Sequence, residues 1–220
     1  MPQSSDKKFF DIKRLPMDMA RIVCIPLLLI FRMKRIDING NPYKKMPSGA
    51  AVIASNHTGF LDPFLTGVCF YKRRMYFLAS EEVMGPKFRA FLLRGVGCIK
   101  IDRKSFDLAG IKTAVNVLKK KKSLLTIYPQ GSIQKDEELK QVKNGAALIA
   151  LQSGSPIIPV YIPKKDNFFS RRIAVVGDMI DTTALCTKKM PSMQDIENVS
   201  IKMLEGLNNC QKAYNTFIKG

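Results

Sequence analysis

The sequence predicts an α/β protein whose central sheet is mostly parallel and flanked by helices. After residue 39, short apolar runs alternate with segments of helical periodicity, which is the pattern of repeated strand–helix–strand units. The chain has 220 residues, of which 46% are hydrophobic, so it is long and apolar enough to bury a core. The turn sequence Asn39-Gly40-Asn41-Pro42 marks the point where this alternation begins.

Six strands and five helices are expected in this part of the chain. The strands are the apolar runs between turn residues, at 50–55, 75–79, 97–101, 124–128, 157–162 and 172–176. The helices are expected at 63–71, 86–93, 105–121, 144–152 and from Ser192 onward. In the third of these helices, Leu108, Ile111 and Val115 share one face with lysines opposite, which is typical of a helix packed on a sheet.

The N-terminal segment, residues 1–38, is expected to form a helical part that contacts a membrane, ahead of an α/β domain at 39–220. Its apolar centre, Ile22–Phe31, is ten residues long, and such a helix spans about 15 Å, roughly half of a bilayer core. We therefore expect a helix, bent near Pro26, that lies in the membrane interface. The alternative is a helix packed on the domain's own core. The cations expected on lipid headgroups are Lys13, Arg14, Arg21, Arg32, Lys34 and Arg35.

The charge balance predicts an anionic partner. The chain carries 36 Lys and Arg residues against 18 Asp and Glu residues, a formal net charge of +18. Such a surface attracts nucleic acid, an anionic membrane or phosphorylated substrates. A nucleic-acid-binding protein would explain the charge alone, but the cations are spread along the chain without a recognised binding motif. We therefore expect an anionic membrane surface as partner and no specific nucleic acid.

The sequence contains no recognisable metal or nucleotide motif. The five cysteines are scattered without a CxxC pair, and one histidine is too few for a zinc-finger ligand set. The GxSxG, GxxxxGK[ST] and GxGxxG patterns are absent, which argues against an α/β-hydrolase, a P-loop NTPase and a dinucleotide enzyme. We expect neither a metal nor a bound cofactor.

The stretch Ser55–Pro63 carries the strongest catalytic signal. His57, the only histidine, follows the apolar run 50–54, and Asp62 lies five residues on, where Asp62-Pro63 opens a helix. In a tight turn these two side chains can meet, and a carboxylate on one imidazole nitrogen leaves the other free to take a proton. The alternative is a structural histidine beside an aspartate that only caps the helix.

Two further stretches end strands and point to anion binding. Arg103 follows a strand, where a guanidinium is placed to hold a phosphate; the alternative is a surface arginine paired with Asp102. The turn Tyr128–Ser132 ends another strand, and its backbone N–H groups could receive an anion, unless it is an ordinary strand–helix loop. Lys143 begins the next helix and could reach the same anion.

Taken together, these motifs resemble those of the glycerolipid acyltransferases. The four ordered motifs are Asn-His-x4-Asp at 56–62, the strand ending Asp102-Arg103, Tyr-Pro-Gln-Gly-Ser at 128–132, and Ser-Pro-Ile-Ile-Pro-Val at 155–160. The closest branch is similar to the 1-acyl-sn-glycerol-3-phosphate acyltransferases. The resemblance covers about half of the chain and implies the fold of that family, without a metal or a covalent acyl-enzyme.

The resemblance also implies roles for individual residues. It makes His57 the general base and Asp62 its orienting partner. The substrate-binding residues would be Asn56, Arg103, Gln130, Gly131, Ser132 and Lys143, with Arg103 on the acceptor phosphate. The acyl side of the site would be shaped by Pro156, Ile157 and Pro159.

The expected activity is transfer of a fatty acyl group from acyl-CoA or acyl-carrier protein to the sn-2 hydroxyl of lysophosphatidic acid, giving phosphatidic acid. The protein would act at the cytoplasmic face of a membrane. In the family's turn, Phe-Pro-Glu-Gly-Thr-Arg, the Glu is replaced here by Gln130 and the Arg by Ile133. These departures leave open a different lysolipid acceptor, or a catalytically impaired lipid-binding homologue.

Overall fold

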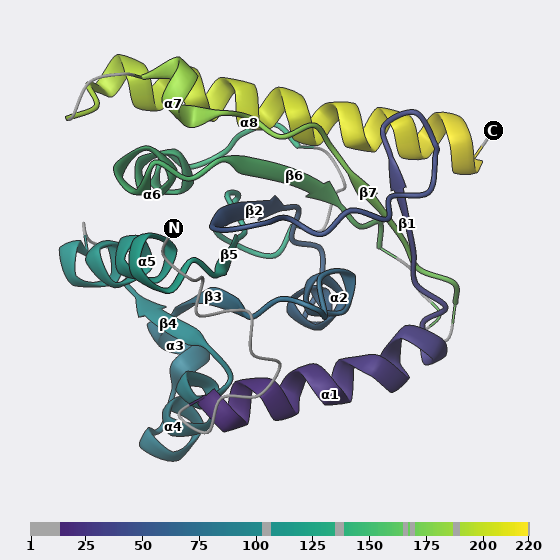
Figure 1. Ribbon diagram of the computed structural model, residues 1–220, viewed down its shortest axis with the longest axis horizontal. Helices are drawn as coiled ribbons and strands as arrows, with labels where there is room; N and C mark the ends of the chain where they lie inside the picture. Colours follow the sequence, from purple (N-terminus) through teal and green to yellow (C-terminus); the bar gives the residue numbers. More distant parts are fainter. Residues whose placement is uncertain are drawn as a thin grey trace.

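The fold is built on a seven-stranded sheet with the strand order β1-β7-β6-β2-β5-β3-β4 (Figure 1). The computed structural model describes residues 14–102, 107–134, 139–164, 167, 170–186 and 190–219. Among the paired strands, β6 and β7 run antiparallel and the other neighbours run parallel. The strands are β1 Lys34–Asp37, β2 Ala51–Ser55, β3 Met75–Ser80, β4 Cys98–Ile101, β5 Leu124–Ile127, β6 Ile157–Tyr161 and β7 Ile173–Val176.

Eight α-helices are described, and a π-helical turn, η3 (Asn215–Lys219), follows the last of them. Several have clear end signals in the sequence: Ser192 and Asp195 form a capping box at the start of α8, and Gly154 ends α6 in the left-handed conformation (φ 62°). The helices are α1 Leu15–Ile30, α2 Asp62–Cys69, α3 Glu81–Met84, α4 Lys87–Gly95, α5 Leu108–Lys121, α6 Gly145–Ser153, α7 Thr182–Leu185 and α8 Met193–Tyr214.

Helices cover both faces of the sheet, so its central strands are apolar on both sides. In β2, Val52 and Ala54 join the core cluster made with α5, α6 and α8, whereas Ala51 and Ile53 join the cluster on the α2 side. All five residues of β2 are buried. Figure 1 shows α8 and α6 on one side of the sheet and α2 and α1 on the other. This arrangement explains why the central strands appear in the sequence as continuous apolar runs.

The predicted α/β fold with a mostly parallel sheet is confirmed. The strand β1 was not expected, because its sequence Lys-Arg-Ile-Asp has a single apolar residue, Ile36, which is buried while its neighbours are not. It lies within the segment assigned above to the N-terminal helical part, yet it pairs with β7 at the edge of the sheet.

Helix α1 packs on the domain through polar residues. Asp18 is 1% exposed and accepts two hydrogen bonds from Arg74, from Nε to Oδ1 and from Nη2 to Oδ2, both 2.8 Å. Arg21 also donates to Asp18, at 3.0 Å, and to the backbone carbonyls of Tyr71 and Lys72. The prediction that Arg21 lies on lipid headgroups is therefore wrong, because its guanidinium is used inside the domain.

None of the described helices is both long and apolar enough to cross a bilayer.

Candidate active site

His57 and Asp62 are in direct contact, as the sequence predicted. His57 follows β2, and its Nδ1 lies 2.8 Å from Oδ2 of Asp62 at the start of α2. A carboxylate can only accept, so Nδ1 carries the hydrogen and Nε2 keeps its lone pair. The two side chains are 13% and 8% exposed, respectively. This pair has the geometry of a general base and its orienting acid.

Backbone hydrogen bonds hold the carboxylate of Asp62 in place. Its Oδ2 also accepts from the N–H groups of Thr58, at 2.6 Å, and Gly59, at 2.9 Å. These two bonds close the turn that brings residue 62 back to residue 57. Asp62 is the first residue of α2 rather than its cap, and Pro63 occupies the first turn, where a missing N–H costs nothing. The alternative of Asp62 as a helix cap is thus not observed.

The ring of His57 stacks on that of Tyr128, which follows β5. The centroids are 4.3 Å apart and the planes differ by 22°. The hydroxyl of Thr66 donates to the carbonyl of Asp62, at 2.7 Å, so it accepts from the hydroxyl of Tyr128, 3.3 Å away. Burial raises the pKa of Tyr128 well above its ordinary value, so this hydroxyl remains a donor. Tyr128 therefore supports the imidazole by stacking on its face. The sequence analysis did not assign this role.

Gln130 binds the backbone of the catalytic turn. Its Oε1 accepts from the N–H of His57 at 3.0 Å, and the carbonyl of His57 accepts from the N–H of Gln134 at 2.8 Å. The turn after β5 thus forms hydrogen bonds with both the backbone N–H and the backbone carbonyl of His57. The side-chain oxygen that was expected to meet substrate is used to position the base. The N–H of Gly131 is also used inside the turn, since it donates to the carbonyl of Tyr128 at 3.0 Å.

Asn56 likewise serves the backbone rather than a substrate. Its Nδ2 donates to the carbonyl of Ile162 at 2.8 Å, and its Oδ1 accepts from the N–H of Ile162 at 2.9 Å. The side chain is buried, with 2% of the residue exposed. The substrate-binding role expected for Asn56 is therefore replaced by a clamp between the ends of β2 and β6.

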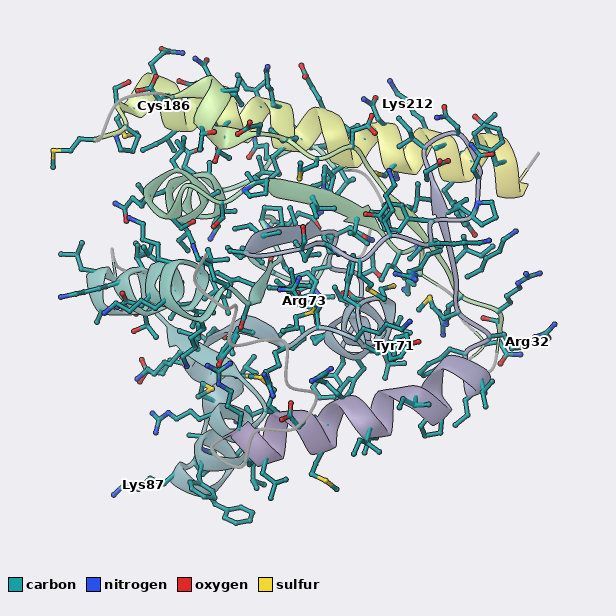
Figure 2. All side chains as sticks on the ribbon, viewed as in Figure 1. Arg32, Tyr71, Arg73, Lys87, Cys186 and Lys212 are labelled. Atoms are coloured by element: carbon teal, nitrogen blue, oxygen red, sulfur yellow. The ribbon has the colours of Figure 1, made fainter. Side chains whose placement is uncertain are left out.

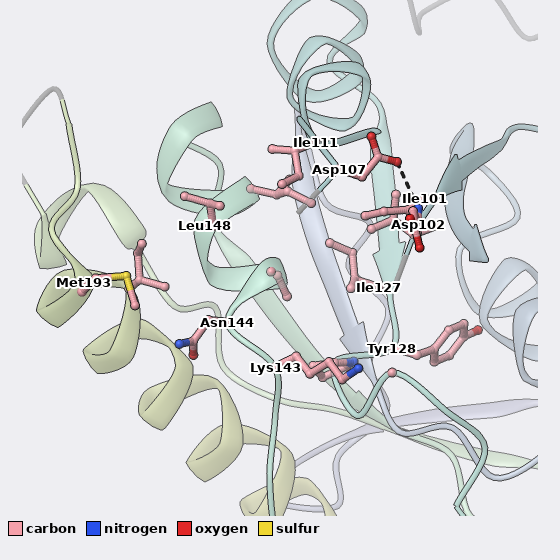
Figure 3. Close-up of a pocket in the computed structure, with 17 residues that line it drawn as sticks. Ile101, Asp102, Asp107, Ile111, Ile127, Tyr128, Lys143, Asn144, Leu148 and Met193 are labelled. Carbon is pink, nitrogen blue, oxygen red and sulfur yellow. Dashed lines mark hydrogen bonds between the residues drawn. The ribbon is translucent and has the colours of Figure 1, made fainter. Parts of the chain in front are cut away.

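An apolar cavity of about 340 Å³ lies beside the turn that follows β5 (Figure 3). Its walls include Ile101, Ile111, Ile127 and Leu148, from β4, α5, β5 and α6, respectively. Tyr128 is shared between the cavity and the catalytic turn: it lines the cavity, while in Figure 3 its ring points away from the other labelled residues.

Polar groups at the cavity come from Lys143, Asp102 and Asp107. The side chain of Lys143 lies against Gly131, where an added Cβ would be 2.8 Å from its Cε, so the left-handed Gly131 (φ 79°) leaves room for the lysine. Asp107 accepts from the N–H groups of Gly110, at 2.8 Å, and Asp102, at 3.0 Å. These bonds lower the pKa of Asp107, that from Gly110 most strongly.

The described residues predicted to shape the acyl side of the site lie outside the apolar cavity. Ile157 is fully buried in the core, and Pro159 packs against α8, where its carbonyl faces the Cys210 thiol. Together with Pro156, they do not line the cavity described above, so the expected acyl wall is not found there. Ser132 is exposed and binds the side chain of Gln134. Arg103 lies outside the described residues.

Comparison with known proteins decides the family. A family model described as Acyltransferase matches residues 35–163. The chain belongs to the acyltransferase family. This confirms the resemblance found in the sequence, and the matched part contains the His57–Asp62 pair, Tyr128 and Gln130. Among the described side chains, no group of three or more His, Cys, Asp and Glu residues is placed to hold a metal ion.

Curated relatives match this chain over part of their length, with identities of about 30% in the aligned segments. The 1-acyl-sn-glycerol-3-phosphate acyltransferase of Streptococcus pneumoniae is 30% identical over 129 residues, 56% of this chain and 47% of the relative. The human protein named 1-acyl-sn-glycerol-3-phosphate acyltransferase beta is 28% identical over 167 residues, 70% of this chain and 59% of the relative. The chain spans about half the length of the curated relatives it matches.

One solved structure supports the fold. The crystal structure of the 1-acyl-sn-glycerophosphate acyltransferase PlsC from Thermotoga maritima has a TM-score of 0.57 and 16% identity to this acyltransferase. The match covers 87% of this chain and 79% of that structure. At this level of identity the likeness concerns the arrangement of helices and strands.

Proposed function

We propose that this protein transfers a fatty acyl group from a thioester, acyl-CoA or acyl-carrier protein, to the sn-2 hydroxyl of lysophosphatidic acid. The observation that carries the proposal is the 2.8 Å contact between Asp62 and Nδ1 of His57, which leaves Nε2 free to act as a base. The family match and the printed names of the curated relatives support the reaction class and the acceptor.

In the proposed reaction, His57 works as a general base without a covalent acyl-enzyme. Nε2 takes the proton of the acceptor hydroxyl as that oxygen attacks the thioester carbonyl carbon. The tetrahedral intermediate collapses, the carbon–sulfur bond breaks, and the departing thiolate receives the proton from the imidazolium. Asp62 stabilises the imidazolium through the Nδ1 hydrogen bond, and positioned base catalysis of this kind contributes about 10²–10⁴-fold.

The surroundings of the pair suit two substrates of different polarity. The cavity beside Tyr128 has apolar walls, which suit an acyl chain. Lys143, packed on Gly131 at the same turn, offers a positive charge to a phosphate. By the family pattern Arg103 binds the acceptor phosphate, and this role remains part of the proposal.

We also propose that the protein works on the cytoplasmic face of an anionic membrane, with α1 in contact with lipid. Helix α1 has the reverse of the usual pattern for a surface helix. Its polar residues Asp18 and Arg21 are buried against the domain, whereas its exposed face is apolar. Phe60, in the catalytic turn, is 78% exposed and would bring lipid close to His57. The exposed apolar residues of α1 are Leu15, Met19, Val23, Ile25, Leu29 and Ile30.

A different lysolipid acceptor is the second candidate, and Ile133 favours it. This residue is 52% exposed and stands where the family turn has an arginine, so one phosphate-binding cation is replaced. Gln130, in contrast, gives little support to an inactive homologue, because the hydrogen bond to His57 needs an acceptor oxygen rather than a charge.

The test is acyl transfer by the full chain in mixed micelles, using labelled oleoyl-CoA or oleoyl-acyl-carrier protein with a panel of lysolipids. The panel contains lysophosphatidic acid, lysophosphatidylglycerol and lysophosphatidylcholine. Labelled phosphatidic acid as the main product is the expected result. A main product from another lysolipid supports the second candidate, and no thioester cleavage with any acceptor overturns the proposed activity.

A further inference from the structure

Helix α4 presents aromatic side chains to the outside of the molecule. Phe88 is 74% exposed, Phe91 72% and Leu92 51%. Their spacing of three and four residues places them on one face of the helix. Lys87 and Arg94 are also exposed and lie near the two ends of this nine-residue helix, and Figure 2 shows Lys87 pointing away from the domain. The helix therefore carries an apolar patch, formed by Phe88, Phe91 and Leu92, between two cations.

The outward direction of this patch is set by contacts on the other side of α4. Arg89 donates from Nε to the carbonyl of Met84, at 3.2 Å, and from Nη2 to the carbonyl of Glu82, at 3.0 Å. Ala90 is buried and packs in a small cluster with Ala79 and Met84. Ala90 thus faces the domain, and the two phenylalanines face away from it.

The end of the helix that carries this patch lies against the start of α1. A Cβ added to Gly95, the last residue of α4, would be 3.4 Å from Cβ of Pro16, so α4 ends against the first turn of α1. Gly97 makes a second close approach, since its Cβ would lie 2.4 Å from Cε of Met17. Figure 1 shows both helices at the same edge of the molecule, far from α8. The exposed apolar residues of α1 and α4 therefore lie on two helices that meet at their ends.

We propose that α4 is a second lipid-contacting helix, which enters an anionic membrane surface through Phe88, Phe91 and Leu92. This inference rests on the membrane association in the proposed function. Phenylalanines between two cations fit the boundary between acyl chains and anionic headgroups, where Lys87 and Arg94 reach phosphates while the rings lie deeper. The formal net charge of +18 adds a general attraction to such a surface. With contacts from both α1 and α4, the domain would hold one orientation on the membrane.

The absence of tryptophan from the sequence gives a direct probe. In the variant Phe91→Trp, tryptophan emission should shift to shorter wavelength with vesicles containing phosphatidylglycerol, and brominated lipids should quench it. The matched control is Ile201→Trp, because this residue of α8 is 49% exposed on the opposite side of the sheet. Its emission should stay unchanged. An unchanged Phe91→Trp emission while the protein sediments with the vesicles would overturn the proposal and leave α1 as the contact.

Binding of the full chain to vesicles provides the second readout. Replacing Phe88 and Phe91 by serine should weaken vesicle binding by about tenfold for each ring, whereas Ile201→Ser should bind as the wild type does. The serine variants at Phe88, Phe91 and Ile201 should all keep wild-type acyl transfer in mixed micelles. This result would show that weaker vesicle binding comes from lost membrane contact and not from unfolding. An emission shift that follows protein concentration without vesicles would indicate a second copy on the patch and overturn the proposal. If acyl transfer is absent in all variants, the emission result still decides the lipid contact.

Discussion

The imidazole of His57 lies flat against the ring of Tyr128, with the two ring centroids 4.3 Å apart. Asp62 holds the same imidazole at Nδ1, so the ring is fixed both in its plane and from its face. Thr66 connects the two supports, because its hydroxyl contacts both the carbonyl of Asp62 and the hydroxyl of Tyr128. The orientation of the imidazole therefore depends on Tyr128, which follows β5, together with Asp62 and Thr66 of α2.

Variants of Tyr128 should separate stacking from hydrogen bonding. Tyr128→Phe keeps the stacked ring and loses one buried hydrogen bond, so we expect nearly unchanged kcat and about 1 kcal/mol less stability. Tyr128→Leu removes the stacking, worth about 0.5–1.5 kcal/mol, and should lower kcat by up to about tenfold. Steady-state kinetics and thermal unfolding measure both effects. Wild-type kcat in Tyr128→Leu would show that stacking does not position the base.

Gln130 should act on the catalytic step rather than on acceptor binding. Gln130→Met removes the acceptor for the N–H of His57, and we expect a lower kcat with little change in the acceptor KM. Gln130→Glu restores an acceptor oxygen at this position and should recover most of the lost rate. If Gln130→Met instead raises only the acceptor KM, then the residue contacts substrate, as its place in the motif first indicated.

Asp107 should make stability depend on acid pH. Its pKa is lowered in the folded state by N–H groups from Gly110 and Asp102, so the carboxylate stabilises the fold at pH values above its unfolded pKa of about 3.9. That contribution is lost as the pH falls through the lower folded pKa. Asp107→Ala should reduce stability by about 1 kcal/mol at pH 7, through loss of the cap on α5, and by less once the pH falls below the folded pKa of Asp107.

Denaturant unfolding at pH 7 and at acid pH checks this difference. Asp107→Asn is the matched control, since asparagine also caps helices but does not titrate. A constant difference between wild type and Asp107→Ala across this pH range would contradict the assigned role.

The buried pair of Asp18 and Arg74 should anchor α1 to the domain. Arg74→Met removes the bidentate partner of the buried Asp18 carboxylate and leaves Arg21 as its remaining cation, so we expect a loss of up to about 3 kcal/mol. The double variant Asp18→Leu/Arg74→Met removes both charges of the pair and leaves Arg21 with the carbonyls of Tyr71 and Lys72, so it should lose less stability than the sum of the two single variants. Chemical denaturation of the wild type, Asp18→Leu, Arg74→Met and the double variant gives the coupling energy. Additive losses would mean that the pair does not act as a unit.

Sequence periodicity predicts most of the sheet, because strands covered by helices on both faces are continuous apolar runs. It does not predict β1, where Ile36 alone is buried between charged neighbours on an edge strand. The inverted face of α1 was also not predictable, since Asp18 is paired with Arg74, 56 residues away, and Arg21 binds the carbonyls of Tyr71 and Lys72.

The contact between His57 and Asp62 was predictable because the two residues are close in the chain. The roles of residues that depend on tertiary contacts were not predictable from the sequence. The oxygen of Gln130 and the amide of Asn56 were expected on substrate, but they bind the backbone of His57 and Ile162. Tyr128 was part of a recognised turn, yet nothing in its sequence position reveals that its ring stacks on a residue that lies 71 positions earlier.

The central claim is that the imidazole of His57 removes the proton from the acceptor hydroxyl. It is tested most directly by the single-turnover rate of acyl transfer for wild type and His57→Ala, with the unfolding temperature of both proteins as the control for folding. We expect a rate about 10²–10⁴-fold lower in a variant that remains folded. A folded His57→Ala protein that transfers acyl groups at the wild-type rate would contradict the account.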